Sequence, residues 1–183
     1  MASNNVNLGV GLSTGMAYRA PEGTALPTSP METLAADWEL IGDVSEDGLT
    51  WGTGKDATPL KNWAKKAVRV VGSDEGGKIT VPFLDTTADT LKTIFGSSNV
   101  TETAATNTHG NIVSVTVAPG VSAPPAAYLF LMKDGDDLLM VGTSSGVITT
   151  LDDITFAPGE PIVWNSTIES DSFTFTKDDG QTI

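Results

Sequence analysis

Apolar and polar residues alternate in short runs over most of the chain, and this pattern predicts a mainly β protein. In the run KITVPFLD at 78–85 every second residue is apolar, which is typical of a strand with one buried face. Pro82 cannot donate a backbone hydrogen bond, so we expect this strand to lie at a sheet edge or to be bulged there. The acidic, glycine-rich SDEGG before it is a turn signal, and it predicts a hairpin between residues 63–72 and 78–85.

Further short runs of β-forming residues continue to the end of the chain. AYLFLMK at 127–133 is apolar on both faces and predicts a central strand, which DGDD at 134–137 turns into a strand at 138–142. Other expected strands are 38–44, 111–118, 146–156, 161–170 and 172–177. Short strands separated by turns at regular spacing indicate a β-sandwich or barrel.

One short α-helix is predicted after these first strands. Thr86 can cap its first turn, and Asp89 three residues later completes a capping box. Apolar residues then recur at helical spacing, and Gly96 supplies a left-handed stop. A helix of about ten residues is too short to be stable alone, so it must pack on a sheet.

The two ends of the chain differ in composition. Residues 1–36 are rich in Gly, Pro, Ser and Thr, and we expect an N-terminal arm that is either a flexible tail or ordered against a partner. Within it, only residues 15–20 are suited to join a sheet. Residues 37–183 are expected to form a single β domain, from which a polar stretch at about 50–64 extends as an arm loop.

The net charge is −13 and the pI is about 4.2, which argue against a protein that holds nucleic acid by its phosphates. The absence of cysteine excludes disulfides and thiolate metal sites. The longest apolar run, at 127–132, is too short to span a bilayer, and the first residues do not resemble a signal peptide. We therefore expect synthesis in the cytoplasm and no membrane partner.

Positive charge is concentrated in one stretch, at 55–78. It holds six of the ten basic residues against three acidic ones, so it carries +3 and the rest of the chain −16. A basic arm on an acidic body suits head-to-tail contact between copies, although a solvated hairpin with ordinary surface lysines is the alternative. The predicted subunit-interface residues are Trp51, Lys55, Leu60, Lys61, Trp63, Lys65, Lys66 and Arg69.

The two tryptophans of this set have a competing interpretation. A large aromatic side chain on a polar, extended segment can anchor in a neighbouring subunit. Both indoles can instead cap the core of their own subunit, and Trp63 is favoured for that role because it opens the predicted hairpin. Both alternatives stay open for Trp51.

Candidate chemistry is sparse. His109, the single histidine, lies in a Thr- and Asn-rich loop without a nucleophile at catalytic spacing. GVGLSTG at 9–15 lacks the Lys-Ser/Thr ending of a phosphate loop. DGDD at 134–137 has oxygen ligands for a cation, but Asp and Gly also suit a hairpin turn there. We predict no catalytic, cofactor-binding or metal-binding residues.

Residues 38–96 carry an ordered set of motifs. The segment reads WELIGDVSEDGLTWGTGKDATPLKNWAKKAVRVVGSDEGGKITVPFLDTTADTLKTIFG. It resembles the major tail tube proteins of siphophages, especially those of actinobacterial phages. Gly42, Val44, Ser45, Glu46, Asp47, Gly48 and Leu49 match the opening of the family pattern, Trp63 and Arg69 its arm and hairpin, and Leu91, Phe95 and Gly96 its helix.

The resemblance implies a non-enzymatic virion protein without cofactors. Its subunits would form rings, usually hexamers, stacked into a tube through which DNA passes without specific binding. The implied partners are further copies of the chain, the tail tip and tape measure proteins, and the tail terminator. The alternatives are a head decoration or tail terminator protein, a type VI secretion tube-like protein and, from another class, a carbohydrate-binding module.

Overall fold

The computed structural model of the protein describes residues 10–11, 17–61, 63–64, 67–74, 76–118, 122–134 and 136–179. Its strands are β1 (Val10–Gly11), β2 (Ala17–Pro21), β3 (Glu39–Gly42), β4 (Thr50–Gly52), β5 (Lys55–Lys61), β6 (Ala67–Asp74), β7 (Gly77–Phe83), β8 (Val100–Thr103), β9 (Ile112–Val115), β10 (Ala126–Asp134), β11 (Asp137–Leu151), β12 (Trp164–Ser170) and β13 (Thr174–Asp178). A helix α1 (Ala88–Phe95) and a 3₁₀ turn η1 (Ser97–Asn99) complete the described elements. The prediction of a mainly β fold with one short α-helix is confirmed.

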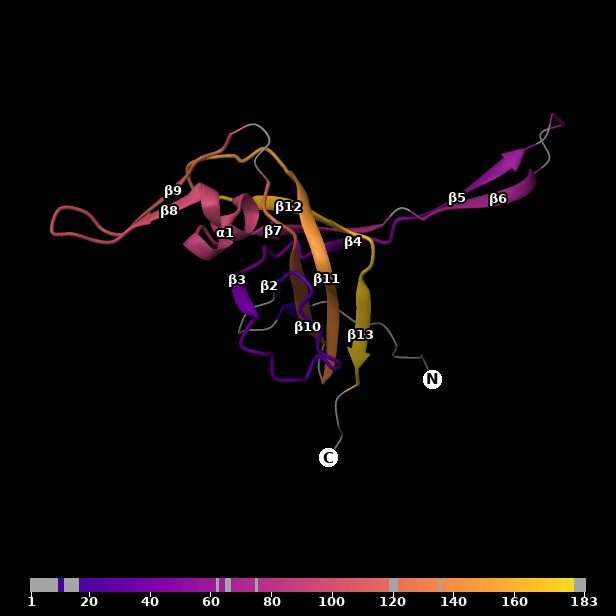
Figure 1. The fold of residues 1–183 in the computed structure, drawn as a ribbon, viewed down its shortest axis with the longest axis horizontal. Helices are drawn as coiled ribbons and strands as arrows, with labels where there is room; N and C mark the ends of the chain where they lie inside the picture. Colours follow the sequence, from indigo (N-terminus) through magenta and orange to yellow (C-terminus); the bar gives the residue numbers. More distant parts are fainter. Residues whose placement is uncertain are drawn as a thin grey trace.

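An antiparallel sheet forms the body, with the strand order β3-β2-β10-β11-β12-β7-β4 (Figure 1). The fifteen-residue strand β11 joins its two halves. Residues 138–142 of β11 lie between β10 and β13, whereas residues 147–151 pair with β12. The two strands expected at 138–142 and within 146–156 are therefore one strand, and that prediction was wrong.

Strand β10 is buried on both faces, which confirms the predicted central strand. Its side chains Tyr128 and Phe130 enter the larger core, which also contains residues of α1, β7 and β12. Leu129 and Leu131 point to a smaller core that Trp38 helps to close. Full burial of one large apolar side chain contributes about 1.5–3 kcal/mol to stability. Because β10 buries such side chains on both faces, it stabilises both cores.

The N-terminal segment contributes to this arrangement. Strand β2 pairs with β10 on one side and β3 on the other, so the stretch expected to join a sheet does so from Ala17 onward. Residues 1–9 and 12–16 of the predicted arm lie outside the described residues. The division of the chain at residue 36 stays a prediction.

Helix α1 forms where the sequence predicts it, but its cap is one residue later. Thr87 is the N-cap, and its hydroxyl accepts a hydrogen bond from the Thr90 amide at 3.2 Å. Thr86 instead accepts a hydrogen bond from the Trp164 indole at 3.1 Å. Gly96 ends the helix with a φ of 83°, and its amide donates to the Lys92 carbonyl. Gly96 therefore stops the helix with a positive φ as expected, but its ψ of 143° lies outside the left-handed helical conformation that was predicted.

Strand β7 has different neighbours from those predicted. It pairs with β12 and β4, whereas β6 pairs with β5, so the hairpin expected between 63–72 and 78–85 was wrong. The strand is also not an edge strand. Strand β4 pairs only with residues 78–80 and ends before Pro82, whose carbonyl accepts a hydrogen bond from the Ser45 amide at 2.8 Å. Because β4 ends before Pro82, no strand on that side needs a hydrogen bond from the amide that proline lacks.

Candidate assembly surface

Strands β5 and β6 form a separate two-stranded antiparallel sheet that projects from the body (Figure 1). The segment expected to be an arm loop at about 50–64 is therefore mostly β4 and the first strand of this arm hairpin. Of the predicted interface residues, Lys55, Leu60 and Lys61 lie in β5 and Arg69 lies in β6. Lys65 and Lys66 lie outside the described residues.

Four glycines lie at the root of the arm hairpin, where its strands leave the body: Gly52, Gly54, Gly76 and Gly77. Gly54 has a φ of 64°, a conformation that favours glycine. A Cβ atom at Gly76 would lie less than 3.0 Å from the Ser170 carbonyl oxygen, and one at Gly77 would lie 2.8 Å from the Phe173 ring. The root therefore requires glycine mainly because two backbones approach closely there.

The two predicted tryptophans lie in opposite environments. Trp51, in β4, is half-buried against the larger core and stacks on Phe175 with ring centroids 6.4 Å apart. Trp63 lies between β5 and β6 and is fully exposed, at 103%. The interpretation of Trp63 as a core residue was therefore wrong. Its interface role, like that of Trp51, stays a prediction.

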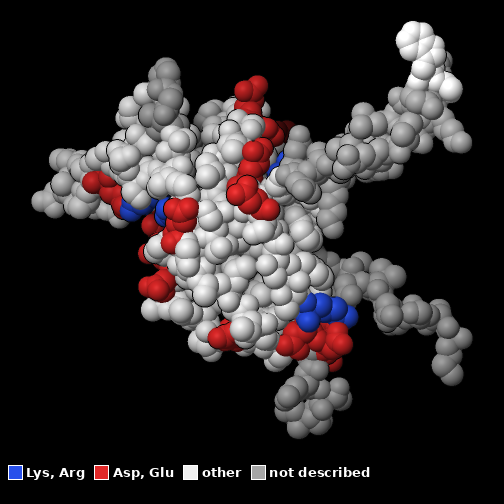
Figure 2. Space-filling view, turned by 45° about the vertical axis from the view of Figure 1, so that its right-hand side comes forward, with Lys and Arg blue, Asp and Glu red and all other residues white. Residues whose placement is uncertain are grey.

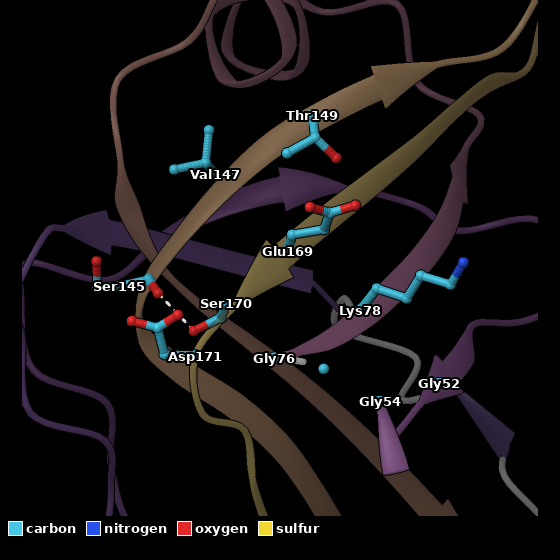
Figure 3. A pocket seen from close by; sticks show the side chains of 11 residues that line it. Gly52, Gly54, Gly76, Lys78, Ser145, Val147, Thr149, Glu169, Ser170 and Asp171 are labelled. Atoms are coloured by element: carbon cyan, nitrogen blue, oxygen red, sulfur yellow. Dashed lines mark hydrogen bonds between the residues drawn. The ribbon is translucent and has the colours of Figure 1, made fainter. Parts of the chain in front are cut away.

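A groove of about 740 Å³ lies beside the root of the arm hairpin (Figure 3). We call it the root groove. Its lining residues are Gly52, Gly54, Gly76, Gly77, Lys78, Ser145, Val147, Thr149, Glu169, Ser170 and Asp171. Because glycines form one side of it, the groove exposes backbone that side chains would otherwise cover.

Carboxylates outnumber cations in the root groove. Lys78 and Glu169 stand opposite each other on neighbouring strands and both extend from the same face (Figure 3). Asp171 adds a second carboxylate. A third carboxylate, that of Glu22, accepts a hydrogen bond of 2.7 Å from the hydroxyl of the lining residue Ser145. The Ser170 hydroxyl donates a hydrogen bond of 2.6 Å to the Ser145 carbonyl oxygen, which joins β12 to β11 within the lining of the groove.

A second hairpin, of β8 and β9, projects from the other side of the body (Figure 1). Val100 and Val115 at its base pack on the larger core, while Ile112, Val113 and Val117 are exposed. A strand was expected at 111–118, and β9 lies within that range, but its pairing with β8 was not predicted. The valines at 113, 115 and 117 indicate a strand and do not indicate its partner.

Two of the five basic side chains on the described part of the body, those of Lys92 and Lys177, form ion pairs with carboxylates. Hydrogen bonding to Glu102 raises the pKa of Lys92, and hydrogen bonds to Asp137 and Asp179 raise the pKa of Lys177. Figure 2 shows acidic groups spread over the surface, with the visible basic groups beside them. The other five basic residues of the chain all lie in the sequence between positions 55 and 69.

Two residues considered as candidate chemistry, His109 and Asp134, lie in a loop and at a turn. His109 lies in the loop between β8 and β9, where its Nδ1 is 2.7 Å from the Gly110 carbonyl oxygen. Asp134 pairs with Asp137 at the turn between β10 and β11, as predicted. No cluster of three metal-ligating side chains occurs among the described residues. The GVGLSTG segment lies largely outside them, and no helix within them has the length and apolarity needed to cross a membrane.

The described residues form a β domain with two projecting hairpins, on which Trp63 and apolar residues of the β8–β9 hairpin are exposed. A family model described as "Phage tail tube protein" matches residues 1–163. The chain belongs to this family of phage tail tube proteins. The family is structural and not enzymatic, and it implies self-association into a tube in the virion tail. No curated protein matches the chain.

Proposed function

We propose that the protein forms rings, hexameric ones by the family resemblance, that stack into the tail tube and conduct genomic DNA during ejection. The observation that carries this proposal is the arm hairpin. Within the part of the chain that the structure describes, its strands pair only with each other, and the Trp63 side chain is fully exposed. Tryptophan is enriched among the residues that contribute most to the binding energy of protein interfaces.

The charge of the subunit supports the role as a DNA conduit. A net charge of −13 repels phosphates, so an acidic lumen lets DNA slide without binding. The basic arm hairpin, in contrast, suits contact with the acidic body of another copy. Tail tip, tape measure and terminator proteins are the proposed partners at the ends of the tube, and assembly follows synthesis in the host cytoplasm.

Replacement of residues 55–74 by a short Gly-Ser linker tests this proposal. The body should retain its fold because β5 and β6 are paired with each other and not with the main sheet. We expect an unchanged β spectrum in circular dichroism and no tubes in negative-stain micrographs, while the unaltered chain forms tubes of uniform diameter. Tubes from the truncated chain would show that the arm hairpin is not the assembly element.

A further inference from the structure

We propose that hydroxyl groups on β11 and β12 set the angle between the two halves of the main sheet and thereby the number of subunits in a ring. This inference rests on the proposed self-assembly and names the part of the fold that determines ring geometry. The first half-sheet contains β3, β2, β10, β13 and residues 137–142 of β11, and the second contains residues 147–151 of β11 with β12, β7 and β4. We call residues 143–146 of β11, which join the two, the sheet corner.

The backbone ladder on one side of β11 is interrupted at the sheet corner. Pairing with β13 ends at Gly142, and pairing with β12 begins at Val147. Both half-sheets nevertheless face the larger core, to which the first contributes Tyr128 and the second Ile168, so the sheet bends around that core. Ladder hydrogen bonds normally fix how neighbouring strands lie. Where they are missing, other contacts must set the angle of the bend.

Side-chain hydroxyls supply these contacts. The Thr143 hydroxyl lies 2.7 Å from the Ser170 hydroxyl and accepts a hydrogen bond of 3.2 Å from the Ser145 amide. The Ser170 hydroxyl also donates to the Ser145 carbonyl oxygen and accepts a hydrogen bond of 3.3 Å from the Ser172 amide. Thr143 is only 2% exposed, so water competes little for its hydrogen bonds. Ser170 thus joins the sheet corner to the end of β12 and to the segment that leads into β13.

The segment that follows β2 holds the sheet corner from the first half-sheet. The Gly23 amide donates a hydrogen bond of 2.8 Å to the Ser144 carbonyl oxygen, and Glu22 accepts one from the Ser145 hydroxyl. The packing is also close, because a Cβ atom at Gly146 would lie 3.0 Å from the Thr143 Cγ2. The corner is therefore attached to both half-sheets and has little room for a second arrangement.

The corner angle affects ring size because neighbours in a closed ring contact opposite sides of each subunit. In the proposed ring one neighbour contacts each half-sheet, so the angle between the half-sheets sets the rotation from one subunit to the next. That rotation is about 60° in a hexamer and about 51° in a heptamer. A change of roughly 9° at the sheet corner is therefore enough to change the ring number.

Tube diameter in negative-stain micrographs tests the proposal through Thr143→Val, which removes the hydroxyl and keeps the shape. Its tubes should differ from wild-type tubes by about one subunit per ring, or vary at least twice as much in diameter. Thr143→Ser keeps the hydroxyl and should keep the wild-type diameter. The matched control Thr80→Val should do the same, because it removes a hydroxyl contact to Thr167, at 3.1 Å, that lies within the second half-sheet.

Wild-type diameter and spread in Thr143→Val tubes would overturn the proposal and leave the proposed function intact. Ser170→Ala, at a half-buried position, provides the same test if Thr143→Val does not fold. Absence of tubes from the unaltered chain would instead refute the proposed function.

A distance measurement on the single subunit decides the question if the variants do not assemble. Because the chain contains no cysteine, Lys133→Cys/Thr150→Cys attaches one spin label to an exposed residue of each half-sheet. Adding Thr143→Val should shift the distance between the labels or at least double the width of its distribution in double electron–electron resonance. Adding Thr80→Val should change neither. A distance distribution that Thr143→Val leaves unchanged overturns the proposal.

Discussion

The substitution Gly76→Ala tests the close packing at the root of the arm hairpin. The added Cβ would lie less than 3.0 Å from the Ser170 carbonyl oxygen and 3.1 Å from the Asp171 Cα. Both are backbone atoms, so no side chain can turn away to make room. Ser170 is held further by its hydrogen bonds to Ser145 and Thr143. The strands must therefore move apart at the root.

The magnitude follows from two opposing terms. Overpacking of this kind costs about 1–3 kcal/mol. An alanine in place of glycine also restricts the unfolded chain, which returns about 0.4–1 kcal/mol. The expected net loss in the free energy of unfolding is about 1–2 kcal/mol. For a domain of this size that corresponds to a decrease of roughly 2–8 °C in Tm.

Thermal unfolding followed by circular dichroism measures this loss. Gly110→Ala is the matched control, because a Cβ there meets nothing within 4 Å and the glycine is in the other hairpin. Its Tm should equal or exceed that of the wild type. All three proteins are compared at one low concentration, since self-association raises apparent stability. Equal Tm values for Gly76→Ala and Gly110→Ala would refute the close-packing account of the root.

Three further outcomes are expected. Burial raises the pKa of Tyr128 to about 12, and the Arg19 guanidinium acts in the opposite direction. The folded state therefore retains a proton that the unfolded state loses near pH 10, and stability falls by about 1.4 kcal/mol per pH unit from pH 10 to 12. Urea unfolding of Tyr128→Phe should lack this fall; an equal fall contradicts the assignment. Thr87→Ala should cost about 1 kcal/mol in chemical denaturation, because it removes the helix cap, whereas Thr87→Ser should cost little. Trp63→Ala should leave Tm unchanged and abolish tubes; a lowered Tm would indicate that the indole packs in its own subunit.

Local signals were sufficient for the helix and the central strand. The α1 segment contains its own cap, apolar face and glycine stop, so its position depended little on the rest of the chain. The run at 127–132 has apolar residues on both faces of the expected strand. Only a strand between two layers buries both of its faces. These elements are therefore readable from sequence, apart from a shift of one residue in the N-cap.

Strand pairing could not be predicted in the same way. β6 ends at Asp74 and β7 begins at Gly77, and both run antiparallel to the stretch that contains β4 and β5, so the SDEGG sequence does not reverse the chain. The partner of β6 is β5, a run with a proline and no clear alternation. Both edges of β7 are occupied, one by β12 and the other by β4, and the sequence of a single strand does not specify such partners.

Strand β11 shows a second limit. Two strands were expected, one ending at Gly142 and one beginning at Gly146, yet β11 continues through both glycines. A Cβ at Gly142 would lie 2.9 Å from the Tyr128 carbonyl, and one at Gly146 would lie 3.0 Å from the Ile168 side chain. These glycines allow other elements to approach closely. Glycine for a turn and glycine for close packing are identical in a single sequence.

The root groove was not predictable at all, since its lining comes from β4, β7, β11 and β12. The concentration of positive charge at 55–78 was visible in the sequence, because those residues are contiguous. The exposed state of Trp63 depended on which strands paired, and so the sequence favoured the wrong environment for it. A surface assembled from distant segments requires the topology first.

Negative-stain electron microscopy of the purified full-length protein tests the central claim most directly. The fold, the family and the projecting arm hairpin together predict tubes of uniform diameter built from stacked rings, formed by the unaltered chain without DNA or other proteins. A chain that stays a folded monomer at high concentration, with no rings and no tubes, would contradict the claim.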